Sequence, residues 1–546
     1  MKKSIKNCKK RENQKNLRNK YDILSYFYLL KYKYTTIEAT KKVANMKKIL
    51  CATNEGIDAK VVAVEATLTK GLPSFSIVGM ISTAISEAKE RVKSALLSND
   101  FSFPPKRITL NLSPSELSKS GSHFDLSIAL LILLNNDKND FDEWFVFGEL
   151  GLSGAVKETI QLYPLILSLA NQGLIQKAIV PEESLQKLSK IPDITFYGVT
   201  TLQEAVAVLR EPDAFKPSLA TAISYPFYEI ANERYYYVQE YKEDFIDVKG
   251  QELAKRAALI AATGMHNLLL EGSPGCGKSM IASRLQYILP PMQMREILDL
   301  AKLQVLEGRE PDFKPHRPLK SPHHSATAAS IFGGGSHNAR IGEVGLANKG
   351  ILFFDELPYF SKAVLEALRE PMQDNKIRIS RVHSKVEYPA DFLFVGAMNP
   401  CPCGNLLDEN KECRCNELEI QRYKNRLSEP FLDRIDLCVV MQNVKVNDQS
   451  SYSSKELHKE VVKAHIFAKE RGQKLFNAKL ADEDIAKYCK MDSVASEVLE
   501  MAVDRFALSF RSIKKVQKVA RTIADLASSE HIKKEHLLEA LSYRRR

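Results

Sequence analysis

The pattern of apolar and polar residues changes twice along the chain. Between Ile49 and about Pro212, short β-branched runs alternate with segments in which apolar residues recur at helical spacing. From Asp247 to about Val446, apolar runs lead into glycine-rich turns, and from about residue 450 the pattern is helical with few turn residues. In the first region the pattern predicts strands at Val61–Thr69 and Arg107–Leu112 and helices at Ile81–Leu97, Phe124–Leu134 and Thr201–Arg210.

These patterns predict an α/β protein of several domains. We divide the chain into a basic extension at 1–45, an α+β domain at 46–212, a linker at 213–245, an α/β domain at 246–446 and a helical domain at 447–546. The length of 546 residues agrees, because a single core rarely serves more than about 300 residues. No apolar run approaches the roughly 18 residues of a membrane helix, and no secretory signal is visible. We therefore expect a cytoplasmic protein with no membrane partner.

The positive charge is concentrated at the N-terminus. Residues 1–45 contain 13 Lys and Arg against 3 Asp and Glu, so they carry +10 of the net +11 of the chain. We interpret this segment as a disordered extension, or as the product of an upstream start codon with Met46 as the true start. A nucleic-acid-binding arm is the alternative. The nearly neutral remainder says little about the partners of the folded part.

An eight-residue motif predicts a nucleotide site. The apolar run Leu268–Glu271 leads into it, and helical residues follow at Met280–Leu289. The motif is G-x-x-x-x-G-K-S, a phosphate-binding loop in its strand–loop–helix context, and its residues are Gly272, Ser273, Pro274, Gly275, Cys276, Gly277, Lys278 and Ser279. The glycines let backbone N–H groups close on phosphate oxygens at the positive end of a helix. We expect ATP here, with Lys278 on the β- and γ-phosphates and Ser279 on Mg²⁺.

Two later strands end in polar residues suited to hydrolysis. Gly350–Phe354 runs into Asp355 and Glu356. Asp355 would hold Mg²⁺ through its water shell, and Glu356 would polarise the attacking water as a general base. The strand Phe392–Met398 delivers Asn399, which would orient the same water. These residues predict an ATPase.

The order of these motifs, preceded by Asp247–Gln251, resembles the AAA+ ATPases. That superfamily works as rings, usually of six, with each nucleotide between two subunits. The segment 427–436 resembles the one that carries the arginine finger, a cation that neutralises charge on the γ-phosphate in trans. Arg434 is the best match by position. The alternatives are that Arg422 or Arg426 takes this role, or that Arg434 forms a local salt bridge with Asp433 or Asp436.

The helical C-terminal region carries one more resemblance to these ATPases. Ser509-Phe510-Arg511 begins a predicted helix, and Arg511 matches the sensor 2 arginine, which reaches back to the nucleotide and couples it to a helical lid. Arg521 is the weaker alternative.

Three further segments resemble the YifB/ComM family of magnesium-chelatase-like ATPases, from about Met46 to the C-terminus. They are Arg317–Ser325 with Gly333–Gly335, Gly342–Ala347, and Met398–Gly404. The resemblance implies a helix-2 insert between about residues 325 and 345 and a second hairpin around Ile377–Glu387. Both hairpins point into the central pore of hexameric relatives.

Three residues of the second hairpin are candidate DNA contacts. Arg381, His383 and Lys385 alternate, so they would share one face of a strand. In a pore they would grip a phosphate backbone through contacts that do not depend on sequence. A solvated strand face is the alternative.

Four of the nine cysteines are close together in sequence, at Cys401, Cys403, Cys413 and Cys415. Zn²⁺ prefers tetrahedral thiolate ligands, so we predict a structural zinc site that would brace Asn399. Reduced, unligated thiols and a redox switch are the alternatives. His323 and His324 also invite a metal interpretation, but a structural role or a contact to a neighbouring subunit is the preferred one.

Residues 46–212 resemble the Lon-protease fold, whose members use a Ser–Lys dyad. By alignment His123 occupies the serine position, and the expected lysine falls near Tyr163. We therefore predict that peptidase activity is absent. A one-residue shift, which would place Ser122 at the serine position, is the alternative.

The family resemblance implies an ATP-driven homo-hexameric ring that acts on DNA. Its ComM members are branch-migration helicases that promote recombination during natural transformation. The alternatives are a magnesium-chelatase-like or protein-remodelling ATPase without DNA activity. ATP, Mg²⁺ and a structural Zn²⁺ are the expected cofactors.

Overall fold

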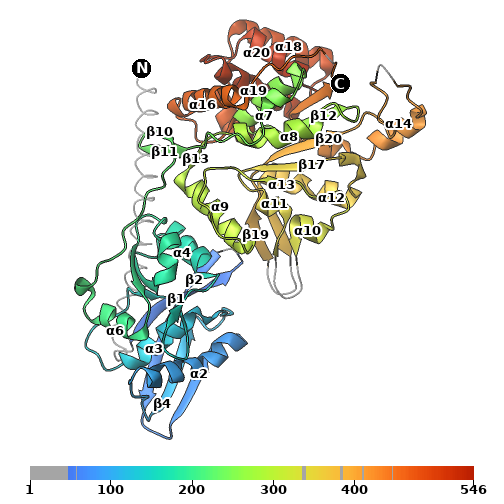
Figure 1. The fold of residues 1–546 in the computed structure, drawn as a ribbon. Helices are drawn as coiled ribbons and strands as arrows, with labels where there is room; N and C mark the ends of the chain where they lie inside the picture. The colour runs from blue at the N-terminus through green and yellow to red at the C-terminus, as the bar shows by residue number, and fades with distance from the viewer. Residues whose placement is uncertain are drawn as a thin grey trace, which may run out of the picture.

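The computed structural model describes residues 47–56, 58–334, 340–380, 385–408, 411–445 and 447–545, apart from the side chains of residues 340, 379, 380, 385 and 386. The described chain forms an N-terminal α/β domain, a second α/β domain that contains the phosphate loop, and a helical domain that packs on the second (Figure 1). This arrangement confirms the prediction of a multidomain α/β protein with a helical C-terminal region. No described helix is long and apolar enough to cross a membrane.

The N-terminal domain is built on a mixed sheet of seven strands in the order β3-β4-β2-β1-β5-β8-β9. β1, β2 and β4 pair antiparallel, and the remaining neighbours are parallel. The strands are β1 (Lys48–Glu55), β2 (Asp58–Thr69), β3 (Ser74–Val78), β4 (Arg107–Ser113), β5 (Phe145–Val146), β8 (Lys177–Pro181) and β9 (Thr195–Val199), with a separate pair β6 (Glu149–Leu150) and β7 (Val156–Lys157). The helices are α2 (Thr83–Ser98), α3 (Asp125–Leu133), α4 (Leu162–Asn171), α5 (Leu185–Leu188) and α6 (Leu202–Arg210).

The two positions that the Lon resemblance singles out are both buried. His123 has 1% of its surface exposed, and its Nε2 lies 2.9 Å from the Ala52 carbonyl oxygen. Burial lowers the pKa of His123 to about 4, so the ring is neutral at pH 7. The hydroxyl of Tyr163 donates to the Leu298 carbonyl oxygen, 3.3 Å away in the next domain. Ser122, the alternative position, donates a hydrogen bond to Glu149.

The second α/β domain contains a parallel sheet in the order β14-β17-β20-β12-β21. Its strands are β12 (Leu268–Gly272), β14 (Leu319–Lys320), β17 (Ile351–Phe354), β20 (Leu393–Met398) and β21 (Leu437–Met441). Every residue of β17 and β20 is buried, as expected for central parallel strands with both faces covered. The helices are α7 (Glu252–Gly264), α8 (Lys278–Leu285), α9 (Met294–Leu306), α10 (Ala328–Phe332), α11 (Glu343–Leu346), α12 (Lys362–Ala367), α13 (Arg369–Asp374), α14 (Glu417–Lys424) and α15 (Glu429–Leu432).

Three small antiparallel units decorate this domain. Two are hairpins, β15 (Gly333–Gly334) with β16 (Arg340–Ile341), and β18 (Lys376–Ser380) with β19 (Lys385–Pro389). The third lies where we expected a linker: β10 (Phe227–Ile230) pairs with β11 (Glu233–Tyr236), which pairs with β13 (Met292–Gln293). The segment 213–245 is thus partly folded onto the second domain.

The helical domain packs against α7 and β21 and shares one buried core with them. Its helices are α16 (Ser454–Glu470), α17 (Asp482–Tyr488), α18 (Ser493–Phe506), α19 (Phe510–Leu526) and α20 (Lys534–Ser542). Short 3₁₀ turns complete the described elements: η2 (Ser122–Phe124), η3 (Glu182–Ser184), η4 (Pro212–Ala214), η5 (Phe245–Asp247), η6 (Gln286–Ile288), η7 (Leu357–Tyr359) and η8 (Asn477–Lys479).

The burial of His123 makes the N-terminal domain sensitive to acid. Its pKa is about 4 when folded against about 6.5 when unfolded, so only the unfolded state takes up a proton as the pH falls below 6.5. The contribution is complete above pH 6.5 and is lost as the pH falls towards 4. As the pH falls from 7.5 to 5.0, the loss of the His123 contribution lowers the free energy of unfolding by about 2 kcal/mol.

Urea unfolding followed by the fluorescence of Trp144, the single tryptophan of the chain, reports on this domain. We expect His123→Gln to make the dependence on pH shallower, whereas His531→Gln, at an exposed position of the helical domain, should leave it unchanged. An identical pH slope in His123→Gln and the unchanged protein would contradict this assignment.

Candidate nucleotide-binding site

The phosphate loop joins the carboxyl end of β12 to the first turn of α8. Gly275 and Gly277 have φ values of 82° and 97°, a left-handed conformation that favours glycine. The hydroxyl of Ser273 is buried and has no hydrogen-bond partner among the described residues. An unpartnered hydroxyl in a loop of this shape fits an anionic ligand, because phosphate oxygens would accept its proton.

Lys278 links the loop to Asn399 at the end of the neighbouring strand. Its Nζ donates to the carbonyl oxygens of Gly272 at 2.6 Å and Ser273 at 2.9 Å, and to Asn399 Oδ1 at 3.1 Å. The side chain is 8% exposed. A phosphate group would replace these carbonyls as the partner of the ammonium and would bring Asn399 close to the same phosphate.

Ser279 and Asp355 are oxygen ligands placed for a divalent cation. Ser279 Oγ donates to Asp355 Oδ2 over 2.8 Å, although 76 residues separate them in sequence. Hydroxyl and carboxylate oxygens are the ligands that Mg²⁺ takes beside nucleotide phosphates, so the pair fits the predicted Mg²⁺ position. β17 and α8 thus bring together two residues that the sequence motifs predicted separately.

Glu356 follows in a constrained backbone conformation. Its φ of 51° is rare for a residue with a side chain, and such conformations occur often at functional sites. Glu356 Oε2 lies 3.4 Å from His324 Nδ1, a contact that the sequence did not predict. The ring of His324 also packs against that of His323 at a tilt of 34°, with ring centroids 4.1 Å apart. Among the described residues, these histidines belong to no group of three or more potential metal ligands.

Arg434 lies near the amino ends of the strands, on the side of the sheet opposite the phosphate loop. It lines a cavity of about 360 Å³ together with Asn267, which immediately precedes β12, whereas the phosphate loop follows β12. The guanidinium donates to the Pro430 carbonyl oxygen and to Gln373 Oε1, each over 2.7 Å. Burial lowers the pKa of Arg434, and the positive charges of Arg511 and Arg369 lower it further. Arg434 makes no described ion pair with Asp433 or Asp436.

Arg511 lines the same cavity as Arg434, at the start of α19. Lys479, Lys515 and Lys518 also line this cavity. Arg511 is exposed, and it lies on the edge of the sheet away from Lys278. One chain therefore presents a phosphate loop at the carboxyl ends of the strands and a group of basic residues at their amino ends.

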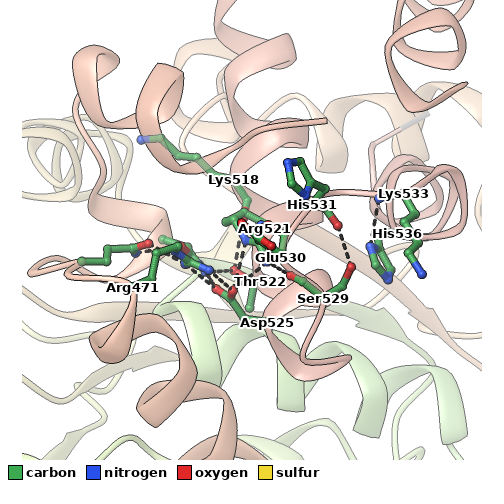
Figure 2. Close-up of polar contacts among 12 residues, drawn as sticks. Arg471, Lys518, Arg521, Thr522, Asp525, Ser529, Glu530, His531, Lys533 and His536 are labelled. Atoms are coloured by element: carbon green, nitrogen blue, oxygen red, sulfur yellow. Dashed lines mark hydrogen bonds and ion pairs between the residues drawn. The ribbon is translucent and has the colours of Figure 1, made fainter. Parts of the chain in front are cut away.

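The remaining arginine candidates have other surroundings. Arg521 is fully buried within the helical domain, and Figure 2 shows its guanidinium directed at Asp525. It donates to Asp525 Oδ1 at 3.0 Å and to the carbonyl oxygens of Glu530 at 2.7 Å and Ser529 at 2.5 Å. All its groups are used inside the domain, so Arg521 holds the lid together. Arg426 donates to the Pro358 carbonyl oxygen, on the Glu356 side of the sheet.

A hydrogen-bond network that sequence motifs did not reveal fixes the main chain at Arg434. Asn267 donates to the Arg434 carbonyl oxygen over 2.7 Å and accepts from the Phe394 N–H over 3.0 Å. Asp436 accepts from the Asn267 N–H, and His266 lies between Asp436 and Thr522 of α19. Burial acts to raise the pKa of Asp436, but the contact with His266, the charge of Lys515 and the hydrogen bond from the Asn267 N–H together outweigh it, so the pKa is lowered. The network connects the lid, the phosphate-loop strand and the arginine segment.

Cys401, the first of the four clustered cysteines, lies two residues after Asn399. The Sγ atoms of the four are all within 4.8 Å of one another, and every described cysteine is free of disulfide bonds. The other candidate interface is less complete: Arg381 and His383 lie outside the described residues, and only the backbone of Lys385 is described, in β19.

Comparison with known proteins covers nearly the whole of this region. Three family descriptions match: magnesium chelatase subunit ChlI at residues 244–449, subunit ChlI of Mg-chelatase at 64–184, and magnesium chelatase subunit ChlI C-terminal at 451–544. The chain is 38% identical to the competence protein ComM of Haemophilus influenzae over 499 residues, covering 90% of this chain and 95% of ComM. It is 37% identical to the YifB protein of Salmonella typhimurium over 500 residues, with the same coverage. The magnesium-chelatase 67 kDa subunit of Heliobacterium mobile is 24% identical over 28% of the chain.

The network around Asn267 predicts a variant that separates hydrolysis from binding. Asn267→Ala removes the bond to the Arg434 carbonyl and leaves the Phe394 N–H unpaired, so the arginine segment should lose its fixed position. We expect the rate of ATP hydrolysis to fall about tenfold or more, with little change in nucleotide affinity. Steady-state hydrolysis and fluorescent-nucleotide titration measure the two quantities. Asn139→Ala, on the surface of the N-terminal domain, is the control; an equal loss of affinity and rate in Asn267→Ala would contradict a positioning role.

Proposed function

Because the chain belongs to the YifB/ComM family of magnesium-chelatase-like proteins, we propose that it is an ATP-hydrolysing AAA+ motor that works as a homo-hexameric ring on DNA. One observation supports the motor most directly: Lys278, Asn399, Ser279 and Asp355 meet at one edge of the sheet, and Arg434 lies at the other. A nucleotide site divided in this way is complete only between two subunits.

The proposed hydrolysis assigns one task to each group at the phosphate edge. The phosphate loop and Lys278 would bind the phosphates through backbone N–H groups and one ammonium. Ser279 and Asp355 would hold Mg²⁺, which supplies charge neutralisation on the phosphates when it is bound. Glu356 would take the proton of the attacking water, and Asn399 would orient that water.

The proposed contribution of the opposite edge is made in trans. Arg434 would neutralise charge on the γ-phosphate of a neighbouring subunit, as an arginine finger does. Arg511 lines the same cavity, so we propose that it also acts on the neighbour's nucleotide and not on that of its own chain. The lid would then report its position to the next site in the ring.

DNA is the proposed substrate, and branch migration during natural transformation is the proposed process. The support is the similarity to the competence protein of Haemophilus influenzae. The β15–β16 and β18–β19 hairpins would provide the contacts, with Arg381, His383 and Lys385 on the phosphate backbone. The protein would act in the cytoplasm, with ATP and Mg²⁺ as cofactors and a structural Zn²⁺ on the four cysteines. A chelatase-like or protein-remodelling ATPase is the alternative.

The N-terminal domain is proposed to be a Lon-like domain without peptidase activity. His123 is neutral and enclosed, and Tyr163 bonds to α9, so neither forms a nucleophile and base pair. The contact of Tyr163 with the second domain supports a structural role in the ring.

The phosphate-edge assignments predict two distinguishable variants. Lys278→Ala should abolish nucleotide binding, whereas Glu356→Gln should bind nucleotide and lose hydrolysis by about 10²–10⁴-fold, since it removes only the base. Steady-state ATP hydrolysis is measured with and without a four-way DNA junction. We expect severalfold stimulation by the junction, which disappears in Glu356→Gln. Robust hydrolysis that is indifferent to DNA would contradict the DNA substrate and favour the alternative.

The division of the site between subunits predicts recovery on mixing. Glu356→Gln and Arg434→Ala should each be inactive alone. Random equal mixing gives roughly one site in four an intact Glu356 and a neighbour's intact Arg434, so part of the hydrolysis should return. The same recovery is expected for Arg511→Ala.

The control is Arg434→Ala mixed with the double variant Glu356→Gln/Arg434→Ala, in which no complete site can form. Absence of recovery for Arg511→Ala alone would place Arg511 on the nucleotide of its own subunit. Absence of recovery for both arginine variants would contradict a shared site.

A further inference from the structure

We infer that Cys401, Cys403, Cys413 and Cys415 form a Zn²⁺ site that holds the phosphate loop in its binding conformation. The four residues are called the cysteine cluster below. The metal assignment stands on the cluster alone, and the effect on ATP binding rests on the proposed nucleotide site.

The distances between the sulfur atoms match a tetrahedral thiolate site. Cys401 Sγ lies 3.4 Å from Cys403 Sγ and 3.7 Å from Cys413 Sγ, and Cys403 Sγ lies 3.7 Å from Cys413 Sγ. A Zn–S distance of about 2.3 Å in a tetrahedron places sulfur atoms about 3.8 Å apart. A disulfide needs about 2.05 Å, so these contacts are too long for a bond. Because Cys415 Sγ also lies within 4.8 Å of the other three sulfur atoms, the arrangement suits four ligands around one ion.

The backbone around the cluster supports the same assignment. The Cys403 N–H donates to Cys415 Sγ over 3.4 Å, so the two C-x-C pairs are joined by more than the sulfur contacts. The Gly404 N–H donates to the Cys401 carbonyl oxygen over 3.0 Å and closes a tight turn. Hydrogen bonds to ligand sulfur atoms commonly orient thiolates at metal sites.

The segment that carries the cluster has little other means of folding. Apart from Gly404, every described residue from 402 to 422 is exposed or half-buried, whereas Cys401 is fully buried. A stretch without buried side chains gains little from the hydrophobic effect, so a bound metal would supply the ordering energy.

The cluster is in contact with the phosphate loop through Gly404. A Cβ atom at this position would lie 2.6 Å from Cδ of Pro274, in the middle of the loop, and 4.0 Å from Cγ of Asn399. Gly404 also has a φ of 82°, which favours glycine. The turn between the first two cysteines therefore rests directly against Pro274. Asn399, two residues before Cys401, bonds to Lys278.

The physical consequence is that the metal fixes two groups of the nucleotide site. Zn²⁺ would hold the Cys401–Gly404 turn, the turn would limit the position of Pro274, and Asn399 would stay in reach of Lys278. Loss of the metal would free this exposed segment and weaken nucleotide binding without removing any group that contacts ATP.

The first test is metal analysis of the full chain purified without chelators. We expect one Zn²⁺ per chain by inductively coupled plasma mass spectrometry, and loss of that zinc in Cys403→Ser/Cys413→Ser. Cys438→Ser, a half-buried cysteine outside the cluster, should keep it. Four freely reacting thiols and no metal would overturn the assignment, as would disulfides in the purified protein or iron in place of zinc.

The second test separates the coupling from the metal itself. Gly404→Ala keeps all four ligands but pushes a methyl group against Pro274, so it should retain zinc and bind a fluorescent ATP analogue about tenfold or more weakly. Removal of zinc by a chelator should weaken binding to a similar extent, and added Zn²⁺ should restore it. Unchanged affinity in both cases would overturn the coupling. Neither readout depends on hydrolysis or on DNA, so failure of the proposed motor function would be seen separately.

Discussion

In a parallel sheet the carboxyl ends of all strands lie on one side and the amino ends on the other. Strand direction therefore decides which side chains meet at each side. In this protein β20 lies between β12 and β17, so the carboxyl ends of three strands bring together the phosphate loop, Asp355 and Asn399. The amino end of β12 faces the cavity of Arg434 and Arg511 instead. A strand of five residues spans about 16 Å, so no side-chain rotation brings Arg434 to the phosphate loop of the same chain. The proposed ring would complete the site by placing the Arg434 cavity of one subunit beside the phosphate loop of the next.

The edge that lacks a phosphate loop is ordered by buried polar contacts. His266, Asn267 and Asp436 join α19 of the helical domain to the segment of Arg434. Buried networks of this kind hold one arrangement well, because a partly broken network costs more than an apolar core of the same shape. A movement of the lid would therefore move Arg434 as well. In the proposed ring, this would give one subunit a physical route to sense the nucleotide state of the next.

The phosphate edge is ordered differently. Glycines and small residues give the phosphate loop its shape but little buried surface, and the loop relies on the groups around it. Gln251 donates to the Cys276 carbonyl oxygen over 3.1 Å from one side, and Gly404 meets Pro274 from the other. The cysteine cluster belongs to this second support. The N-terminal domain is held together instead by a large apolar core, which encloses His123 as a neutral ring.

Local sequence determined the groups whose chemistry depends on neighbours in the chain. The phosphate loop, the Asp355–Glu356 pair and the cysteine cluster could all be predicted, because each is a short motif with fixed spacing. Periodicity predicted strands β2 and β4 and helices α2, α3 and α6 of the N-terminal domain, together with the helical C-terminus, but it did not predict the other strands and helices of the N-terminal domain. Pairs such as Ser279 with Asp355 or His324 with Glu356 are joined by strand order, and strand order is not written in any local pattern. Only the tertiary structure decided that Arg511 shares a cavity with Arg434. It also decided that all the hydrogen bonds of Arg521 stay inside the helical domain, and that Gly404 packs against Pro274. These contacts join segments far apart in the chain, and packing, which is the sum of many weak contacts across the whole fold, selects them.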